Sequence, residues 1–270
     1  MKIILMGTND WVIPMFERAA LEHEIVAVFT RGPKPVGRKK IVTPSPVHVW
    51  AAGRGIPVYN KVKGFADLDL PQADYIVVAS YGVILKDDVL NFAPCINIHP
   101  SDLPAYRGPA PMSTAVYNGV LESAVCLMQV AAEVDAGDVY MRRNFAIGEN
   151  DTTADIEARV GEMSAGMLSE FLAAPEKCEP WPQSGRATFT RKWTSDDEWI
   201  DWSRGAHAVH NQVRAIGGRT KINGLDVKIL ETRVANGELE ILRVQPAGKN
   251  PMPWRDFVNG QRGKIEFGER

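Results

Sequence analysis

Side chains that can do chemistry gather in residues 96–108, which read INIHPSDLPAYRG after a long apolar run. Asn97 and His99 lie two residues apart, so in a strand both side chains point to the same face. The prolines that follow hold the exit from the strand rigid. A second stretch, EVDAGDVY at 133–140, places Asp135 at the predicted end of a neighbouring strand and Gly137 in a turn.

An amide, an imidazole and a carboxylate brought together this way suit acyl transfer without a nucleophilic Ser or Cys. An amide can stabilise an oxyanion, an imidazole can move a proton, and a carboxylate beside the imidazole can orient it and raise its pKa, which favours the charged form. A histidine at a strand end is more often held by a local hydrogen bond than catalytic. The second stretch, around Asp135, favours a catalytic role for His99 because it places a carboxylate on a neighbouring strand.

The elements that must position these residues alternate between short apolar runs and helical patterns. Predicted strands cover 2–6, 24–30, 74–80 and 96–99, and predicted helices cover 11–21, 46–52 and 87–92. This alternation predicts an α/β fold with a Rossmann-like, mostly parallel sheet, which binds ligands beyond the carboxyl ends of its strands. The turn at 7–10 is not GxGxxG and no GxxxxGK occurs, so neither a dinucleotide nor an ATP site is expected.

Beyond residue 123 the pattern changes. Strands are predicted at 124–131 and 139–147, a long amphipathic helix at 152–172, a short helix at 206–216, and strands within 221–234 and 239–245. We therefore expect a catalytic domain at 1–174, a proline-rich linker at 175–186, and a small β-rich domain at 187–270.

The composition, 45% apolar and 24% charged over 270 residues, is that of a globular protein. No apolar run is long enough to span a membrane and the amino terminus does not read as a secretory signal, so we expect a cytoplasmic location and no membrane partner. Cys95, Cys126 and Cys178 are widely spaced, which indicates neither disulfides nor a metal site.

The net charge of −2 is unevenly distributed, because residues 186–270 carry +4 and residues 1–185 carry −6. Within the acidic part, RGPKPVGRKK at 31–40 has five basic residues and no carboxylate. Its glycines and prolines argue against a regular element and predict an exposed loop. The loop is either simply solvated or a contact for an anionic partner such as RNA.

The segments INIHPSDLPAYRGPAP and LMQVAAEVDAGDVY resemble the signature region of the formyltransferases that use 10-formyltetrahydrofolate, and most closely those that act on methionyl-tRNA. MKIILMGTNDW, VFTRGPKPVGRKK, VVASYGVIL, WIDWS and VQPAGKNPM resemble further landmarks of the same family. The resemblance implies an enzyme of translation initiation that takes the formyl group from 10-formyltetrahydrofolate, needs no metal and acts on charged initiator tRNA. We expect it to be a monomer.

Carried onto this sequence, the resemblance implies three sets of residues. The catalytic trio falls on Asn97, His99 and Asp135. The folate would lie against two loops, at Tyr81, Gly82, Val83, Ile84, Leu85, Ala131, Ala132, Glu133 and Val134. The acceptor or tRNA would contact Arg31, Lys34, Arg38, Lys39, Lys40 and Arg107, although Arg107 is equally open to a structural role.

Two departures from the family pattern leave the acceptor open. Asp102 stands where the family usually has a leucine, and residues 217–245 look shorter than the family's carboxyl-terminal barrel. The alternatives are a formyltransferase acting on an amino sugar nucleotide or another small amine, and a non-catalytic relative that binds RNA or folate. A metal site at His207 and His210 is a weaker option, because no acidic or cysteine ligand lies nearby.

Overall fold

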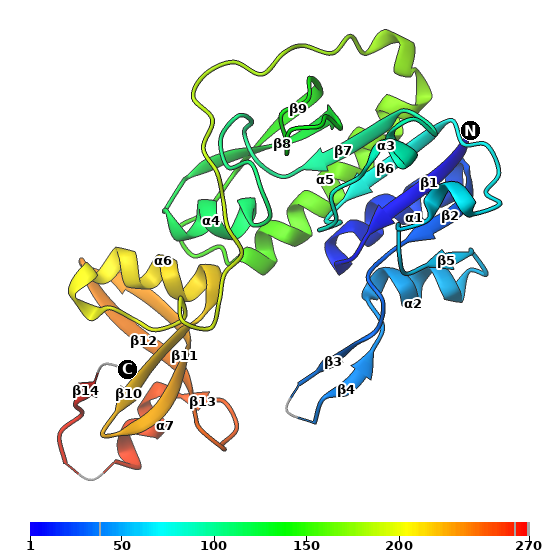
Figure 1. Cartoon of the computed structure of the whole chain (residues 1–270). Helices are drawn as coiled ribbons and strands as arrows, with labels where there is room; N and C mark the ends of the chain where they lie inside the picture. Colours follow the sequence, from blue (N-terminus) through cyan, green and yellow to red (C-terminus); the bar gives the residue numbers. More distant parts are fainter. Residues whose placement is uncertain (38, 262, 269–270) are drawn as a thin grey trace. The chain divides into compact units, whose positions relative to one another are not determined.

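The computed structural model describes residues 1–37, 39–261 and 263–268. The chain forms two compact units, and each is made of segments that are separate in the sequence (Figure 1). The first contains Met1–Pro109, Ala124–Phe145 and Glu157–Phe189, and the second contains Ala110–Ser123, Ala146–Ile156 and Thr190–Arg270. The predicted division into a domain at 1–174, a linker at 175–186 and a domain at 187–270 concerns which segments fold independently. It remains a prediction.

A seven-stranded sheet organises the first unit, in the order β5-β2-β1-β6-β7-β8-β9. Its strands are β1 (Lys2–Gly7), β2 (Glu24–Phe29), β5 (Val58–Tyr59), β6 (Tyr75–Ala79), β7 (Cys95–His99), β8 (Glu122–Gln129) and β9 (Val139–Ala146). The pairs β5/β2, β2/β1, β1/β6 and β6/β7 are parallel, whereas β7 and β8 are antiparallel. The predicted mostly parallel α/β sheet is therefore confirmed.

Helices border this sheet at α1 (Ile13–Glu22), α2 (Pro46–Gly53), α3 (Asp87–Leu90) and α5 (Thr153–Ala173). Helix α2 begins where the hydroxyl of Ser45 accepts a hydrogen bond from the backbone N–H of His48, with Pro46 in the first turn. On α5, Phe171 packs edge-on against Tyr75 of β6 and also contacts Tyr140 of β9. Helix α5 therefore covers the face to which Tyr75 points.

The opposite face of the sheet carries a separate apolar cluster. Because side chains alternate along a strand, Ile76 and Val78 point away from Tyr75, and they join a core with Phe29 and Phe65. Val78 lies in register with Asn97 of β7. Asn97 and His99 therefore project from the face of the sheet that lies opposite α5.

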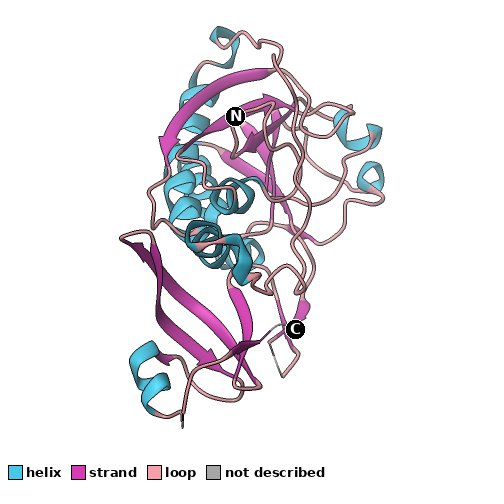
Figure 2. Ribbon diagram, turned by 90° about the vertical axis from the view of Figure 1, so that its left-hand side faces the viewer, coloured by secondary structure: helices cyan, strands magenta, loops and turns pink. Residues whose placement is uncertain are grey.

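The second unit is built on an antiparallel sheet ordered β13-β12-β11-β10-β14, which appears in Figure 2 as a twisted set of long strands. Its strands are β10 (Gly218–Ile222), β11 (Leu225–Ala235), β12 (Glu238–Pro246), β13 (Met252–Pro253) and β14 (Phe267–Gly268). The helices of this unit are α4 (Pro111–Tyr117), α6 (Ala206–Ile216) and α7 (Trp254–Asn259). Val209 and Val213 of α6 form a core with Ile229 and Val244, which confirms the β-rich carboxyl-terminal region.

Three predictions of local structure need correction. Residues 31–40 contribute to a short antiparallel hairpin of β3 (Lys34–Val36) and β4 (Ile41–Thr43), because Pro35 is tolerated on a strand that has only one partner. Helix α3 ends at Leu90 instead of residue 92. Helix α4 was not predicted, since its sequence PMSTAVY contains β-branched residues that favour strands. Among the described residues, no helix is long and apolar enough to cross a membrane.

Candidate active site

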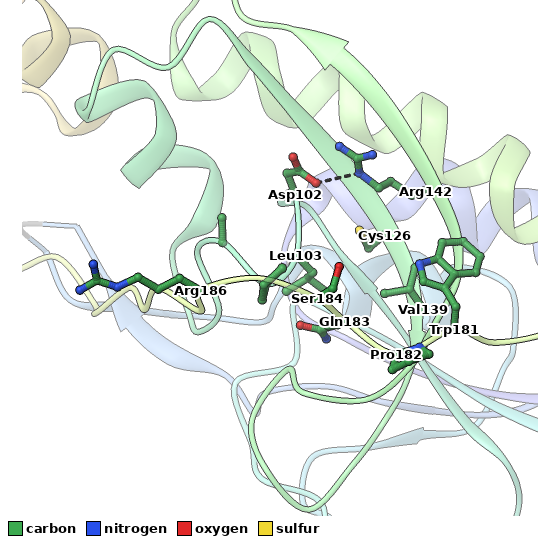
Figure 3. A pocket seen from close by; sticks show the side chains of 12 residues that line it. Asp102, Leu103, Cys126, Val139, Arg142, Trp181, Pro182, Gln183, Ser184 and Arg186 are labelled. Carbon is green, nitrogen blue, oxygen red and sulfur yellow. Dashed lines mark ion pairs between the residues drawn. The ribbon is translucent and has the colours of Figure 1, made fainter.

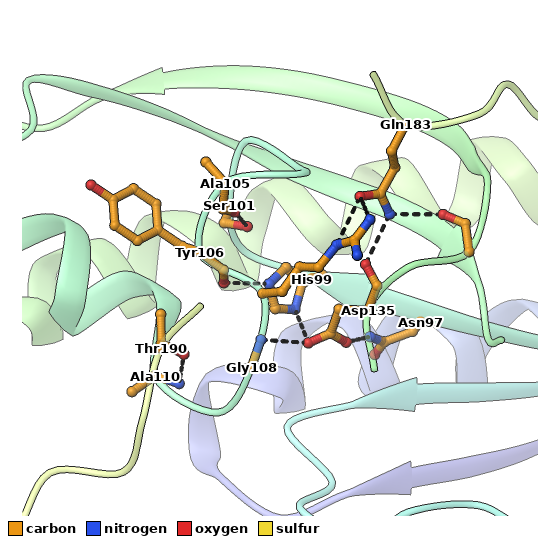
Figure 4. A network of polar contacts seen from close by, with 12 residues as sticks. Asn97, His99, Ser101, Ala105, Tyr106, Gly108, Ala110, Asp135, Gln183 and Thr190 are labelled. Carbon is orange, nitrogen blue, oxygen red and sulfur yellow. Dashed lines mark hydrogen bonds and ion pairs between the residues drawn. The ribbon is translucent and has the colours of Figure 1, made fainter. Parts of the chain in front are cut away.

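Strand β7 carries Asn97 and His99 on one face, as their spacing predicts. Asn97 is half-buried and His99 is only 4% exposed. Figure 4 shows both side chains pointing toward Asp135, which approaches from the connection between β8 and β9. The structure thus brings together the three residues that the sequence singled out.

Asp135 does not end a strand, contrary to the prediction, since β8 ends at Gln129. It lies in the loop that follows, with φ +50°, a left-handed conformation that is uncommon for residues other than glycine. One carboxylate oxygen, Oδ2, accepts a hydrogen bond of 2.7 Å from the backbone N–H of Gly108 and lies 3.6 Å from His99 Nδ1. The other, Oδ1, accepts a longer hydrogen bond of 3.4 Å from the amide of Asn97.

Gly137 allows this loop to fold back. A Cβ atom at residue 137 would lie 2.1 Å from the carbonyl oxygen of Gln129, closer than atoms can approach. The backbone N–H of Gln129 donates to the carbonyl of Asp138, so the loop begins and ends at one hydrogen-bonded pair. The requirement for glycine is therefore a close approach of two backbone segments, in addition to the predicted turn.

The two nitrogens of the His99 ring face different groups. Nε2 lies 3.0 Å from the carbonyl oxygen of Tyr106, and a carbonyl oxygen only accepts hydrogen bonds, so Nε2 carries the proton in this contact. In the neutral ring, Nδ1 then holds a lone pair on the side of Asp135. His99 is accordingly arranged to accept a proton at Nδ1.

Burial lowers the pKa of His99 below its ordinary value, because the charged ring is poorly solvated. The carboxylate of Asp135 and the carbonyl of Tyr106 act in the opposite direction, and the guanidinium of Arg107 adds to the lowering. Asp135 therefore favours the charged form of His99, as expected, but desolvation is the larger effect and the net shift of the His99 pKa is downward. A pKa below the ordinary value favours the neutral form of the His99 ring at neutral pH.

This shift fixes the sign of a pH dependence. If His99 must be neutral to accept a proton, a pKa below 6.5 means that we expect the acid-side midpoint of the kcat profile to lie below pH 6.5. Replacing Asp135 by asparagine removes a charge that raises this pKa, so the decline should move to lower pH while kcat falls. Measured pH profiles of kcat for both proteins test this, and a midpoint above pH 6.5 in the wild-type protein contradicts it.

Arg107 is largely buried and its guanidinium is held inside the protein. Nη1 lies 3.3 Å from Glu133 Oε1, and Nη2 donates a hydrogen bond of 2.8 Å to Gln183 Oε1. Gln183 lies in the predicted linker and gave no signal in the sequence, because its partners are far apart along the chain. The predicted contact between Arg107 and the acceptor stays a prediction.

Comparison with known proteins shows which family this chain belongs to. The family model described as formyl transferase matches residues 1–172, and the model of the formyl transferase C-terminal domain matches residues 192–239. The chain belongs to the formyl transferase family.

Individual formyl transferases match along almost the whole chain. Methionyl-tRNA formyltransferases of Paracoccus denitrificans and of a Jannaschia species are each 36% identical, over 96% and 97% of this chain and 97% of either relative.

Two solved formyl transferases share the fold. The methionyl-tRNA formyltransferase from Clostridium thermocellum superposes with a TM-score of 0.65 at 18% identity, covering 91% of this chain and 98% of that chain. An N-formyltransferase from Helicobacter canadensis in complex with folinic acid and dTDP-3-aminofucose gives a TM-score of 0.69 at 22% identity, covering 87% and 88%.

The loops predicted to hold the folate of this formyl transferase lie near one apolar cluster. The first loop follows β6 and contains Tyr81 and Leu85, which pack against that cluster together with Val130 from the second loop. Val83, Ile84 and Val134 leave large apolar side chains exposed. Gly82, Ala131, Ala132 and Glu133 are exposed in the same two loops.

A pocket of about 400 Å³ opens beside the 102–105 turn (Figure 3). Leu103, Cys126 and Val139 form an apolar part of its lining. Asp102, the residue that departs from the family pattern, pairs with Arg142 at 2.7 Å at the edge of this pocket. The carboxylate is therefore neutralised by an ion pair.

Within the described residues, the basic segment of the formyl transferase supplies strand β3 of the β3/β4 hairpin. Lys34, Lys39 and Lys40 are exposed on it, whereas Arg31 is half-buried at its base. The predicted contact at Arg38 lies outside the described residues. The hairpin also exposes the apolar side chains of Val36, Ile41 and Val42.

The alternative metal site at His207 and His210 gains no support. His210 Nδ1 lies 2.9 Å from the hydroxyl of Thr232, and Nε2 lies 3.0 Å from the carbonyl of Glu149, so both ring nitrogens are engaged by the protein. Within the part of the chain that the structure describes, no cluster of three or more His, Cys, Asp or Glu side chains is arranged to hold a metal.

Proposed function

We propose that this protein transfers the formyl group of 10-formyltetrahydrofolate to the α-amine of methionyl-tRNA. The observation that carries the proposal is the convergence of Asn97, His99 and Asp135 on one face of β7. Relatives of 36% identity that match along nearly their whole length are methionyl-tRNA formyltransferases, which favours this acceptor. An acceptor used in translation also favours a cytoplasmic location.

Each member of the trio has a separate part in the reaction. Formyl transfer joins the amine nitrogen to the formyl carbon, breaks the bond from that carbon to the folate nitrogen, and moves one amine proton. Asn97 has two amide hydrogens and gives one to Asp135, which leaves the other for the developing oxyanion. One well-placed donor of this kind contributes roughly 3 kcal/mol.

His99 moves the proton. Its neutral Nδ1 accepts the proton from the attacking amine and returns it to the departing folate nitrogen, a contribution of about 100- to 10,000-fold. Asp135, itself held by the backbone N–H of Gly108, stabilises the positive charge that the ring carries once Nδ1 has taken the proton. No covalent enzyme intermediate is needed, because the acceptor amine is itself a nucleophile.

The residues of the two predicted folate loops fit a flat heterocycle. Exposed apolar side chains at Val83, Ile84 and Val134 suit contact with its faces, and the neighbouring backbone offers donors and acceptors for its edges. The pKa of Tyr81 is raised by burial, so its hydroxyl stays protonated as a hydrogen-bond donor. We place the folate against these loops, with its formyl group toward Asn97.

An acceptor panel tests the proposed function. The full-length protein is incubated with 10-formyltetrahydrofolate and, separately, methionyl-tRNA, free methionine and an amino sugar nucleotide, and products are identified by mass spectrometry. Formylation of methionyl-tRNA alone is expected. Formylation of the sugar nucleotide alone would establish the alternative acceptor, and folate binding without any product would establish a non-catalytic relative.

The β3/β4 hairpin provides a test of the tRNA contact. Replacing Lys34, Lys39 and Lys40 together by alanine should weaken tRNA binding and reduce the slope of log affinity against log salt by up to about 3, because each phosphate contact contributes somewhat under 1. Folate affinity should not change. Filter-binding titrations of tRNA at several salt concentrations measure the tRNA affinity and its salt slope.

The matched control replaces Lys61, Lys63 and Lys177, which are also exposed lysines of the first unit. It removes the same charge, so a loss of affinity equal to that of the hairpin variant would show a general electrostatic effect. An unchanged salt slope in the hairpin variant would show that the hairpin is a solvated connection that does not contact tRNA.

A further inference from the structure

Gln183 lies in a segment whose backbone is hydrogen-bonded to other segments both before and after this residue. Trp181 exchanges two backbone hydrogen bonds of 2.9 Å with Val139 of β9. Thr188 accepts at its carbonyl a hydrogen bond of 2.9 Å from the backbone N–H of Arg107. Gln183 is the one residue of 181–186 that is not exposed, so its side chain turns inward from a fixed backbone (Figure 4).

The amide of Gln183 is fully used by groups around the candidate active site. Its Nε2 donates to the carbonyl oxygens of Asp135 at 2.9 Å and Gly137 at 2.8 Å. Its Oε1 accepts from Nε of Arg107 at 3.2 Å and from Nη2 at 2.8 Å. Two acceptors face the nitrogen and two donors face the oxygen, so the orientation of the amide is fixed by its partners.

These contacts bracket the part of the loop that carries the catalytic carboxylate. The carbonyls of Asp135 and Gly137 flank Ala136, and the left-handed backbone of Asp135 is a conformation that needs support from its surroundings. Arg107 precedes Gly108, whose N–H binds the Asp135 carboxylate. Gln183 therefore ties together the two backbone segments that hold Asp135 beside His99.

We propose that Gln183 is a positioning residue that sets the distance between the Asp135 carboxylate and the His99 ring. The inference rests on the proposed function for its effect on turnover. The structural part, an effect of Gln183 on the His99 ring, does not depend on any substrate.

The test compares Gln183→Ala and Gln183→Glu with the wild-type protein. Glutamate keeps an acceptor for Arg107 but cannot donate to the carbonyls of Asp135 and Gly137. Both variants should lower kcat by roughly 10- to 100-fold, with a smaller change in KM for the formyl donor, because a small displacement of a catalytic group is costly. Gln72→Ala is the matched control, since Gln72 also donates to two backbone carbonyls, those of Ala73 and Phe92, in the same unit.

The second readout is the titration of the His99 ring by histidine nitrogen NMR, assigned with His99→Ala. The charged groups that act on this ring are Asp135 and Arg107. If Gln183 holds the carboxylate in place, its loss weakens the effect that raises the His99 pKa, so the midpoint should move to lower pH in Gln183→Ala and not in Gln72→Ala.

The outcomes separate the two proposals. Lowered kcat with a shifted His99 midpoint, and a melting temperature close to that of Gln72→Ala, supports the positioning role. An unmoved His99 midpoint in Gln183→Ala, the variant that adds no charge, overturns it, whatever happens to kcat. A shifted His99 ring in a protein that formylates no acceptor upholds the positioning role and rejects the proposed function.

Discussion

Replacing His99 by alanine is expected to lower kcat for formyl transfer by at least about 100-fold, the lower end of the contribution of a positioned proton acceptor. The neutral ring has its Nδ1 on the side of Asp135, and alanine leaves no group there to take the amine proton. The KM for the formyl donor should change much less, because this role is exerted in the transition state. Steady-state kinetics at saturating acceptor measure both constants.

The control for this variant is His207→Ala, which removes an exposed histidine of the second unit. It should keep wild-type kcat. The melting temperature of His99→Ala must also be compared, since His99 is buried and its ring fills space against its neighbours. A folded His99→Ala protein with near-normal turnover would remove His99 from the mechanism.

Replacing Asn97 by alanine is expected to lower kcat by roughly 100- to 1,000-fold, the range found when one oxyanion donor is removed. Asn97 also donates to Asp135 Oδ1, so part of the loss comes from a less restrained carboxylate. Asn97→Asp keeps the size of the side chain but replaces the donor by a negative charge, and it should be at least as impaired. Single-turnover measurements with bound folate isolate the chemical step.

Asn91→Ala provides the comparison for Asn97, because Asn91 is an exposed asparagine that directly follows α3. It should behave as wild type. If Asn97→Asp turns over at the wild-type rate, the amide hydrogens of Asn97 do not stabilise the oxyanion, and the donor must be sought in the backbone.

The sequence by itself was sufficient for the central parallel strands of the sheet. The runs at 2–6, 24–30 and 74–80 became β1, β2 and β6, because strands buried on both faces of a parallel sheet are continuously apolar and are bounded by polar turns. The spacing of Asn97 and His99 also determined that they share a face, since alternation along a strand is a local property of the backbone.

Local sequence patterns predicted secondary structure less well where pairing with another segment of the chain decides it. Residues 34–36 contain a proline and lie between glycines, which indicated a loop, yet they pair with 41–43 as a two-stranded hairpin. Asp135 was placed at the end of a strand because the apolar run of β8 continues to residue 131. The structure ends β8 at Gln129 and gives Asp135 a left-handed backbone in the following loop.

Only the tertiary structure decided the state of His99 and the part played by Gln183. The sequence shows a carboxylate that raises the pKa of the imidazole, but burial, which lowers it and is the larger effect, depends on every chain segment packed around the ring. Gln183 meets Asp135 and Arg107 across 48 and 76 residues of sequence. Such contacts leave no periodicity in the sequence, because they arise from the path of the chain in space and not from the local geometry of a helix or strand.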